Sequence, residues 1–196
     1  MQIETTIEPV IMRRRITVEE YEVMYEAGVF KPDERLELIN GEILKVAPMN
    51  APHIAHVANL SRLLIETFGK RVTVFTQLPV ILTDDSEPEP DIALLKWRKD
   101  HYFSRKATAS DVYLLIEVAD TSLLYDRRVK LPLYARAGVP EVWIVKVQER
   151  ELEVYRNSKG EAYSESRVLK PSDVVSLLAF PDVEILLSEV FITPDA

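Results

Sequence analysis

Two short apolar runs, each with an acidic residue at one end, constrain the fold of this chain more than any other feature. Asp91 comes directly before the apolar residues 92–95, and Glu117 lies near the end of residues 112–118, the most hydrophobic strand-like run. An ionised carboxylate at the end of a buried strand is unfavourable unless another group pairs with it. If the two strands pair antiparallel, the start of one lies beside the end of the other. The sequence therefore predicts both carboxylates at one end of a central sheet, where they share a cation.

The order of the predicted elements indicates an α/β fold of the mixed α+β kind, with helices packed on a central mixed sheet. Continuous apolar runs such as residues 92–95 are typical of strands that are buried on both faces. Apolar residues also recur at helical spacing after residue 54. The predicted strands lie near residues 72–76, 79–83, 91–95, 112–118 and 141–147, and the predicted helices that flank them at residues 54–68 and 127–137.

A helix and a hairpin are expected before this core, and a second hairpin after it. Thr17 and Glu20 form a capping-box pattern, which predicts an N-terminal helix. Asn40-Gly41 between two apolar runs is a strong signal for a hairpin turn. Strand-like segments within residues 152–169 predict the C-terminal hairpin.

The length of 196 residues suits one domain, and we expect an N-terminal arm over residues 1–14 and a single domain over residues 15–196. No apolar run is long enough to span a bilayer, and the N-terminus has no continuous apolar segment typical of a secretory signal. We therefore expect a cytoplasmic protein with no membrane partner. The absence of cysteine excludes disulfides and thiolate metal sites. A net charge of −8 argues against a broad basic face for nucleic acid, although it permits a local basic cleft.

The pair of acidic residues predicts a site for a hard divalent cation. Mg²⁺ and Mn²⁺ prefer carboxylate and carbonyl oxygens, so we expect Asp91, Glu117 and the main-chain carbonyl of Val118 as ligands. A bound ion of this kind lowers the pKa of water and neutralises a phosphate. The alternative is that each acidic side chain faces solvent at the edge of a strand.

Lys130 supplies the positive charge of the predicted site. A lysine beside a metal orients the attacking water and offsets charge that develops on phosphate. The alternative is a solvated helix lysine. Pro132 cannot donate a main-chain hydrogen bond, so the helix either kinks there or begins near it, which leaves Lys130 just ahead of the helix.

Four further polar residues are accessory candidates. Glu37, on the first predicted hairpin, is a further metal ligand or supports one. His53 and His56 bracket the start of the longest predicted helix, where they contact phosphate or carry a proton. Asp126 lies four residues ahead of the predicted catalytic lysine. The structural alternatives are an exposed strand glutamate and two histidines at a helix start.

Several segments together resemble a known family. They are Arg35-Leu36-Glu37-Leu38-Ile39-Asn40-Gly41-Glu42, His53, Glu89-Pro90-Asp91, Ile116-Glu117-Val118, Tyr125-Asp126-Arg127-Arg128-Val129-Lys130 and Leu133-Tyr134-Ala135-Arg136-Ala137-Gly138-Val139-Pro140-Glu141-Val142-Trp143-Ile144-Val145. Over residues 15 to 190 this series resembles the Uma-two family of restriction endonucleases. The resemblance implies a restriction-endonuclease-like core of the PD-(D/E)XK type, with DNA as the substrate.

The site residues of the family carry over by position. Asp91 matches the PD acid, and Glu117 matches the second acid. The usual lysine, two residues after the second acid, is Ala119 here, and the resemblance implies that its role passes to Lys130 on the following helix. Two departures from the family are the turn after Glu117, which lacks a Ser-Pro-Ser-like sequence, and Lys146, where relatives commonly have aspartate.

Three functions are compatible with the sequence. The first is a metal-dependent DNA endonuclease that hydrolyses phosphodiester bonds, which the intact acids and lysine favour. The second is a catalytically silent relative that binds nucleic acid or a protein, which the net charge of −8 favours. The third is a homodimeric scaffold. Residues 183–191 are more apolar than a lone surface helix needs, so they cap the core or form a dimer interface, and we expect a homodimer.

Overall fold

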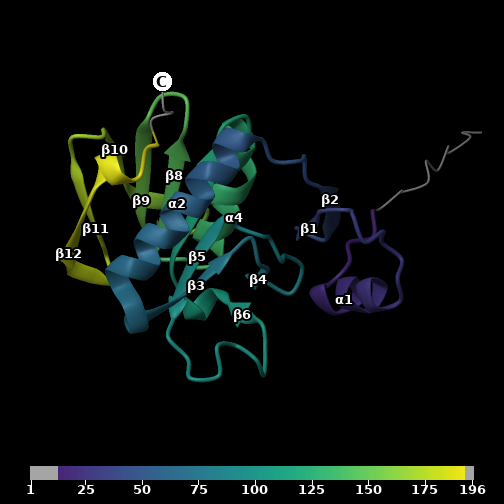
Figure 1. The fold of residues 1–196 in the computed structure, drawn as a ribbon. Coiled ribbons are helices and arrows are strands. Elements are labelled where there is room, and N and C mark those ends of the chain that lie inside the picture. Colours follow the sequence, from purple (N-terminus) through teal and green to yellow (C-terminus); the bar gives the residue numbers. More distant parts are fainter. Residues whose placement is uncertain (1–12, 193–196) are drawn as a thin grey trace, which may run out of the picture.

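The structure is a computed structural model that describes residues 13–192, and at its centre is a six-stranded mixed sheet (Figure 1). The sheet strands are β3 Val72–Thr76, β5 Ile92–Lys96, β7 Val112–Ala119, β8 Glu141–Lys146, β9 Glu151–Lys159 and β10 Ala162–Leu169. The other elements are α1 Val18–Glu26, β1 Leu36–Ile39, β2 Glu42–Lys45, α2 Ala51–Phe68, β4 Val80–Ile81, β6 Ala107–Thr108, α3 Leu123–Tyr125, α4 Leu131–Arg136, β11 Val174–Leu177 and β12 Phe180–Leu186. The strand order is β10-β9-β8-β7-β5-β3, in which β7 and β8 are parallel and the other neighbours are antiparallel. The predicted mixed sheet is confirmed.

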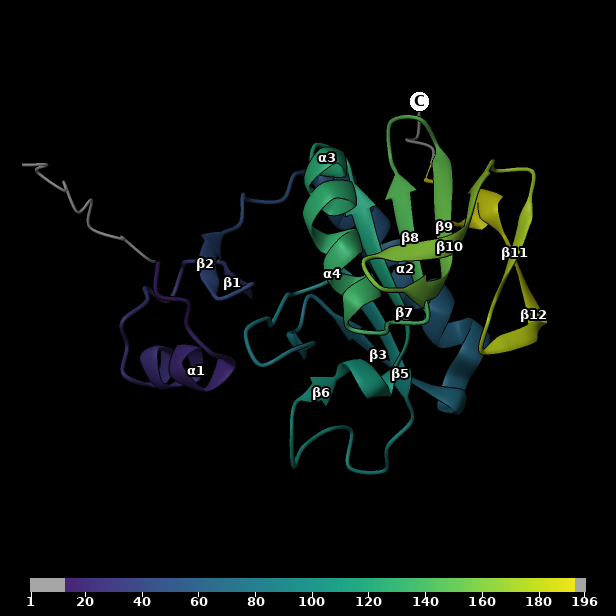
Figure 2. The same ribbon diagram turned by 180° about the vertical axis from the view of Figure 1, so that it is seen from behind.

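Helices cover both faces of this sheet because its central strands are apolar on both sides. α2 lies across one face, and α3 and α4 lie on the other (Figure 1, Figure 2). Successive side chains of β5 alternate between the two cores. Ile92 and Leu94 pack in the core beneath α2, whereas Ala93 and Leu95 pack in the core beneath α4. The strand is therefore fixed from both sides, and so is the residue that precedes it.

α1, β1 and β2 form a lobe, residues 16–46, that lies beside the main sheet (Figure 1, Figure 2). α1 begins with the predicted capping box. The predicted hairpin turns at Asn40 and Gly41, which both have positive φ angles, of 50° and 74°. The loop between β4 and β5 holds the lobe, since the amide of Glu87 donates a 2.7 Å hydrogen bond to the carbonyl of Leu38. The lobe is thus attached to the segment that leads into β5.

The prediction that residues 79–83 form a strand of the central sheet is wrong. Gln77 has a φ of 51°, a left-handed conformation that turns the chain out of the sheet directly after β3. β4 pairs instead with β6, in parallel, as a separate two-stranded sheet. The far edge of the central sheet is formed by β9 and β10, the predicted C-terminal hairpin. α2 begins at Ala51 rather than at residue 54, because Asn50 caps it.

The apolar run over residues 183–191 caps the core of its own chain. Ile185, Leu187, Val190 and Phe191 are all buried in the cluster beneath α2. These side chains are therefore not available for a dimer interface. The homodimer remains a prediction, without the support of this run.

No helix within residues 13–192 is long and apolar enough to cross a membrane. The predicted N-terminal arm over residues 1–14 falls, except for its last two residues, outside the part of the chain that the structure describes.

Candidate active site

Asp91 and Glu117 come together at one end of the central sheet. β5 and β7 are antiparallel, with Ile92 opposite Ile116. Asp91 therefore enters β5 beside the end of β7, where its Oδ2 accepts a 2.8 Å hydrogen bond from the amide of Val118. Because side chains alternate along a strand, both carboxylates lie on the face that α4 covers. The antiparallel arrangement predicted from the two apolar runs is observed.

Asp91 is held as an anion. The ring nitrogen Nε2 of His53 lies 3.0 Å from its Oδ2, and the side-chain amide of Gln77 donates to its Oδ1 at 3.3 Å. Burial raises the pKa of Asp91, but the hydrogen bond and charge of His53 and the amide of Val118 outweigh burial and leave this pKa below its usual range.

The pKa of Glu117 is shifted in the opposite direction. Its carboxyl group is fully enclosed, and it accepts a hydrogen bond from the hydroxyl of Tyr134. Burial raises the pKa of Glu117 well above its usual value, and the negative charges of Asp126 and Asp91 add to this effect.

Lys130 reaches these carboxylates because the helix widens ahead of α4. Asp126–Lys130 form a π-helical turn, in which the amide of Leu131 bonds to the carbonyl of Asp126. Pro132 lies in the first turn of α4, where its missing amide leaves no broken bond. α3, this turn and α4 follow one another directly along the chain, so Lys130 lies within the helical stretch predicted over residues 127–137 rather than ahead of it. π-helical turns are rare and occur frequently at functional sites.

The ammonium group of Lys130 bridges two elements. Its Nζ lies 3.1 Å from Oε1 of Glu37 and 3.2 Å from Oε1 of Glu117. Burial lowers the pKa of Lys130, but the carboxylates of Glu117 and Glu37, followed by those of Asp126 and Asp91, outweigh burial and raise the pKa above its usual value. The lysine is therefore charged, and it offsets part of the negative charge of the acidic cluster.

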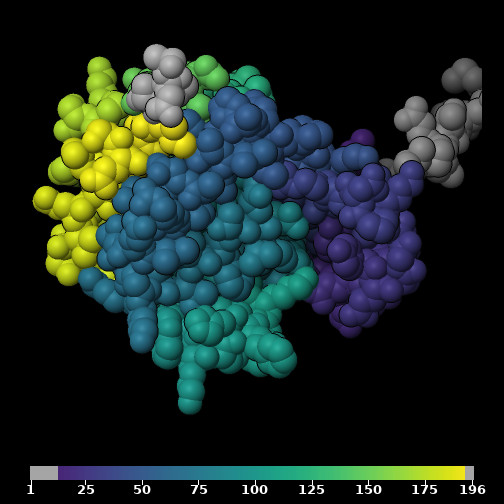
Figure 3. Space-filling view, viewed as in Figure 1, coloured from purple at the N-terminus to yellow at the C-terminus, as the bar shows by residue number. Residues whose placement is uncertain are grey.

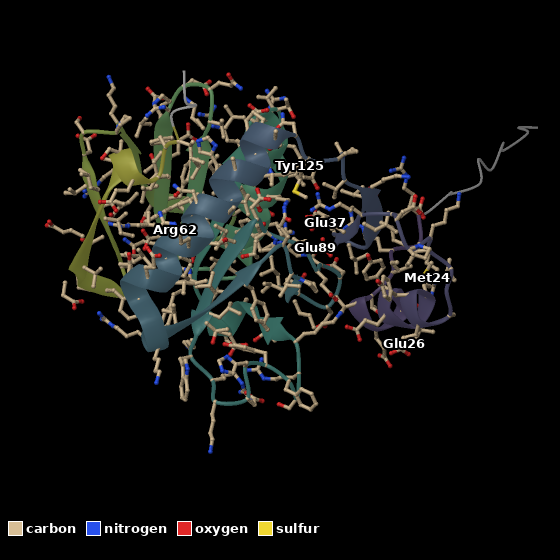
Figure 4. All side chains as sticks on the ribbon, in the orientation of Figure 1. Met24, Glu26, Glu37, Arg62, Glu89 and Tyr125 are labelled. Atoms are coloured by element: carbon tan, nitrogen blue, oxygen red, sulfur yellow. The ribbon has the colours of Figure 1, made fainter. Side chains whose placement is uncertain are left out.

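Glu37 comes from β1 of the lobe and is only 2% exposed. Its Oε1 accepts hydrogen bonds from Lys130 and from the amide of Glu89, whereas its buried Oε2 has no partner among the described residues. Figure 4 shows Glu37 and Glu89 close together where the lobe meets the main sheet, with Tyr125 nearby. The accessory role predicted for Glu37 is consistent with this position.

Asp126 is a further buried acid of the cluster. Its Oδ2 accepts a 2.6 Å hydrogen bond from the hydroxyl of Ser122. Burial raises the pKa of Asp126 to about 6, although Ser122 and Lys130 oppose the shift. A carboxyl group with this pKa exchanges its proton close to neutral pH.

The two histidines have different positions. His53 lies in the first turn of α2 and contacts Asp91, and its Nδ1 is buried without a partner among the described residues. His56 lies outside the cavity that the acids line. Its Nδ1 lies 2.8 Å from the carbonyl of Pro52, and its ring packs against Phe191. Only the first histidine is placed to act at the site.

The acids and the lysine line one cavity of about 460 Å³. The lining includes Arg35 and Lys45 from the lobe, which bring positive charge to it. Sequence reasoning missed Gln77 and Tyr134 as partners of the acids. The Tyr-Ala-Arg-Ala-Gly-Val-Pro-Glu segment contains the tyrosine and could have indicated it, whereas no local pattern singles out the glutamine.

The donor chemistry of this cavity fits a hard divalent cation. Asp91, Glu117 and Glu37 offer carboxylate oxygens, and the unpartnered Oε2 of Glu37 can still accept a ligand. Within residues 13–192, however, no three acidic or histidine side chains already converge as a formed metal site.

A mixed sheet with helices on both faces, and with acids and a lysine at one end of it, defines a protein of the nuclease-fold class. The fold resembles a crystal structure described as "a putative nuclease belonging to DUF820" from Anabaena variabilis, with a TM-score of 0.67 and 16% sequence identity. The match covers 90% of this chain and 97% of that chain. At this identity the likeness shows the fold alone.

The sequence itself gives the family. The model of the Uma2 family, described as "Putative restriction endonuclease", matches residues 18–188. The chain belongs to the Uma2 family. Among curated proteins, none matches it.

Proposed function

We propose that this protein is a Mg²⁺- or Mn²⁺-dependent DNA endonuclease whose active site is the cavity around Asp91, Glu117 and Lys130. The observation that supports this function best is the convergence of the three side chains at one end of the sheet, in a chain of the Uma2 family. The overall reaction is hydrolysis. The hydroxyl part of a water joins phosphorus, and its other hydrogen goes to the sugar oxygen that departs.

Each side chain has a separate task in this proposal. Asp91, Glu117 and the main-chain carbonyl of Val118 would hold the divalent ion. When bound, the ion lowers the pKa of a water and neutralises phosphate charge. Lys130 presents its ammonium group to the charge that grows on the phosphate. His53 and Gln77 keep the carboxylate of Asp91 ionised and oriented.

The lobe contributes to substrate binding. Arg35 lines the cavity, and its guanidinium can contact a phosphate oxygen as DNA enters. Glu37 pairs with the same ammonium group of Lys130 that Glu117 contacts. The substrate would therefore lie between the lobe and the end of the sheet.

A catalytically silent protein that binds nucleic acid or a protein partner is the second candidate. It is favoured by the lack, within the described residues, of a formed three-ligand metal site. The two candidates differ in one measurable property, which is metal-dependent cleavage.

Incubation of supercoiled and single-stranded DNA with the protein and Mn²⁺ tests the proposal. The parent should nick or cut the DNA, and Asp91→Ala should not, because it removes a metal ligand. Asp182→Ala, at an exposed carboxylate paired with Arg71, is the matched control and should cleave like the parent. Equal cleavage by the parent and by Asp91→Ala would falsify the assignment of this site.

A further inference from the structure

The loop that joins β5 to β6, residues 96–106, is the most basic short segment of an acidic protein. It carries five cationic side chains and one carboxylate, whereas the whole chain has a net charge of −8. The five are Lys96, Arg98, Lys99, Arg105 and Lys106. We call this segment the basic loop. It stands out from the body at the lower edge of the view (Figure 1, Figure 3).

The basic loop has a well-defined internal structure. Tyr102 is buried at its centre, and its hydroxyl donates a 2.7 Å hydrogen bond to the carbonyl of Lys96. The guanidinium groups of Arg98 and Arg105 lie over the Tyr102 ring at 5.3 and 5.4 Å. The Nε and Nη2 atoms of Arg98 each donate a 2.8 Å hydrogen bond to the carboxylate of Asp100. The loop therefore presents its outer side chains from a fixed frame.

At the outer side of this frame Phe103 is 95% exposed, and Trp97 is 47% exposed. Exposed apolar side chains mark an interaction surface where they join a contiguous apolar patch. Phe103 also borders a surface hollow of about 380 Å³, whose other apolar walls include Leu78 and Pro79. The hollow thus combines an exposed ring with apolar wall residues.

The cationic groups of the basic loop are of two kinds, those that are paired within the protein and those that are not. Arg105 is held by Asp111, and Lys106 by Glu22 and Glu87. Lys96 and Lys99 are exposed, and neither forms an ion pair with any residue in the described part of the chain. These two lysines carry positive charge that only a partner can neutralise.

The hollow lies near the proposed active site and on the same side of the sheet. Phe75 of β3 packs edge-on against Tyr102, with ring centroids 5.5 Å apart, and both rings belong to the core beneath α4. Asp91 and Glu117 lie on the same face of the sheet. Two residues after Phe75, Gln77 hydrogen-bonds Asp91, and the next residue, Leu78, lines the hollow. One short segment therefore joins the two cavities.

We propose that the basic loop is a second nucleic-acid contact, in which an unstacked base packs on Phe103 in the hollow while Lys96 and Lys99 bind the neighbouring phosphates. Aromatic rings combined with cationic side chains are the usual means of binding single strands without sequence preference. The proposal rests on the nuclease function proposed above and adds the kind of substrate, which is DNA with a single-stranded or frayed segment.

A lipid surface is the other anionic partner that such a loop can meet. The geometry favours nucleic acid, because a walled hollow beside one ring suits a flat base, whereas membrane insertion is favoured by a continuous apolar face. The experiment therefore includes both partners.

Fluorescence anisotropy with a short labelled single-stranded oligonucleotide, in EDTA so that no cleavage occurs, measures the contact directly. Phe103→Ala should weaken binding about tenfold, because loss of one stacked base is a loss of this order. Phe103→Trp keeps an aromatic ring at this position and should bind the oligonucleotide like the parent. Tyr25→Ala removes another exposed aromatic side chain, 69% exposed on α1, and should bind like the parent. Lys99→Gln should reduce the magnitude of the slope of log K against log salt concentration by about 0.7, because one phosphate contact is lost.

The outcomes separate this proposal from the nuclease function. Binding that depends on Phe103 in a protein that never cleaves DNA would uphold the contact and reject the nuclease. Cleavage by the parent together with unchanged binding by Phe103→Ala would overturn the contact alone. Absence of oligonucleotide binding by the parent would also overturn it. So would Phe103-dependent binding of the parent to phosphatidylglycerol vesicles but not to the oligonucleotide.

Discussion

At the scale of single residues, more acidic than basic side chains line the cavity. Lys130 is charged, and Asp91 is ionised, while burial makes both Glu117 and Asp126 retain protons to higher pH than usual. Like charges this close cannot all ionise unless a proton or a cation lies between them. The site therefore exchanges protons in the range where the enzyme is proposed to work.

Asp126→Asn should change how stability depends on pH. The pKa of Asp126 is about 6 in the folded protein and 3.8 as its ordinary value, so between these values the folded state binds more protons. Stability from this group is present below pH 4 and is lost as the pH rises through 6, by up to about 3 kcal/mol. Urea unfolding should show that the free energy of unfolding of the variant rises relative to that of the parent from pH 4 to 7. A constant difference, or the same gain in Asp182→Asn at an exposed site, would contradict this account.

Lys130→Ala should slow DNA cleavage by ~10²-fold or more, as the loss of a preorganised charge usually does. Metal binding should survive, because the carboxylate ligands remain and lose a competing cation. Initial rates of plasmid nicking and Mn²⁺ titration measure the two effects separately. Lys70→Ala, at an exposed lysine after α2, is the control. Loss of metal binding in Lys130→Ala, with normal binding in the control, would assign the lysine a structural role.

At the scale of elements, the first turn of α2 connects helix capping to the site. Asn50 caps the helix by accepting a 3.0 Å hydrogen bond from the amide of His53, and the ring of His53 contacts Asp91. Asn50→Ala should lower the free energy of unfolding by about 1 kcal/mol. It should also raise the pKa of Asp91, measured by NMR titration, because His53 is less firmly placed.

Thr17→Ala is the matched control for this effect. Thr17 caps α1 in the same way, but α1 lies in the lobe and makes no contact with Asp91 in the described structure. The substitution should reduce stability to a similar degree and leave the pKa of Asp91 unchanged. A rise in that pKa in both variants would show that global loosening, not His53, is the cause.

The sequence predicts elements well where local patterns determine them. The buried strands β5 and β7, and the antiparallel pairing that brings Asp91 to Glu117, follow from apolar runs with acids at their ends. The hairpin at Asn40-Gly41 follows from turn chemistry. Lys130 follows from the basic segment that comes after the two acids, and the family resemblance supports it. The widened helical turn that contains it is not predicted by the sequence, because that turn depends on packing as well as on Pro132.

Other features depend on contacts between distant segments, and no local pattern reveals them. The left-handed conformation of Gln77 both removes residues 79–83 from the sheet and directs an amide to Asp91. Glu37 joins the site only because the lobe docks on the loop between β4 and β5. His53 and His56 are not distinguished by the sequence. His56 lies about one helical turn further along α2, where its Nε2 accepts a hydrogen bond from the amide of Ile192 in the C-terminal segment.

At the scale of the whole molecule, the C-terminal segment closes the core beneath α2. Leu187 is fully buried there, whereas its neighbour Leu186 is 42% exposed. Leu187→Ala should lower the free energy of unfolding by ~2–5 kcal/mol, as deletion of a buried leucine side chain does, and Leu186→Ala should have little effect. Urea unfolding measures this, and sedimentation should show the same assembly state for both variants. A folded Leu187→Ala protein that sediments more slowly than the parent would place this residue in a dimer interface instead.

The shared hydrogen bonds of Lys130 link the lobe to the sheet in a further way. One ammonium group forms ion pairs with Glu37 of the lobe and with Glu117 of β7. It therefore links two parts of the molecule, in addition to its proposed catalytic role. An anion that draws this group toward itself weakens the attachment of the lobe. By thermodynamic reciprocity, whatever fixes the lobe makes the lysine less available to the anion. Docking of the lobe and capture of a phosphate are therefore two sides of one equilibrium.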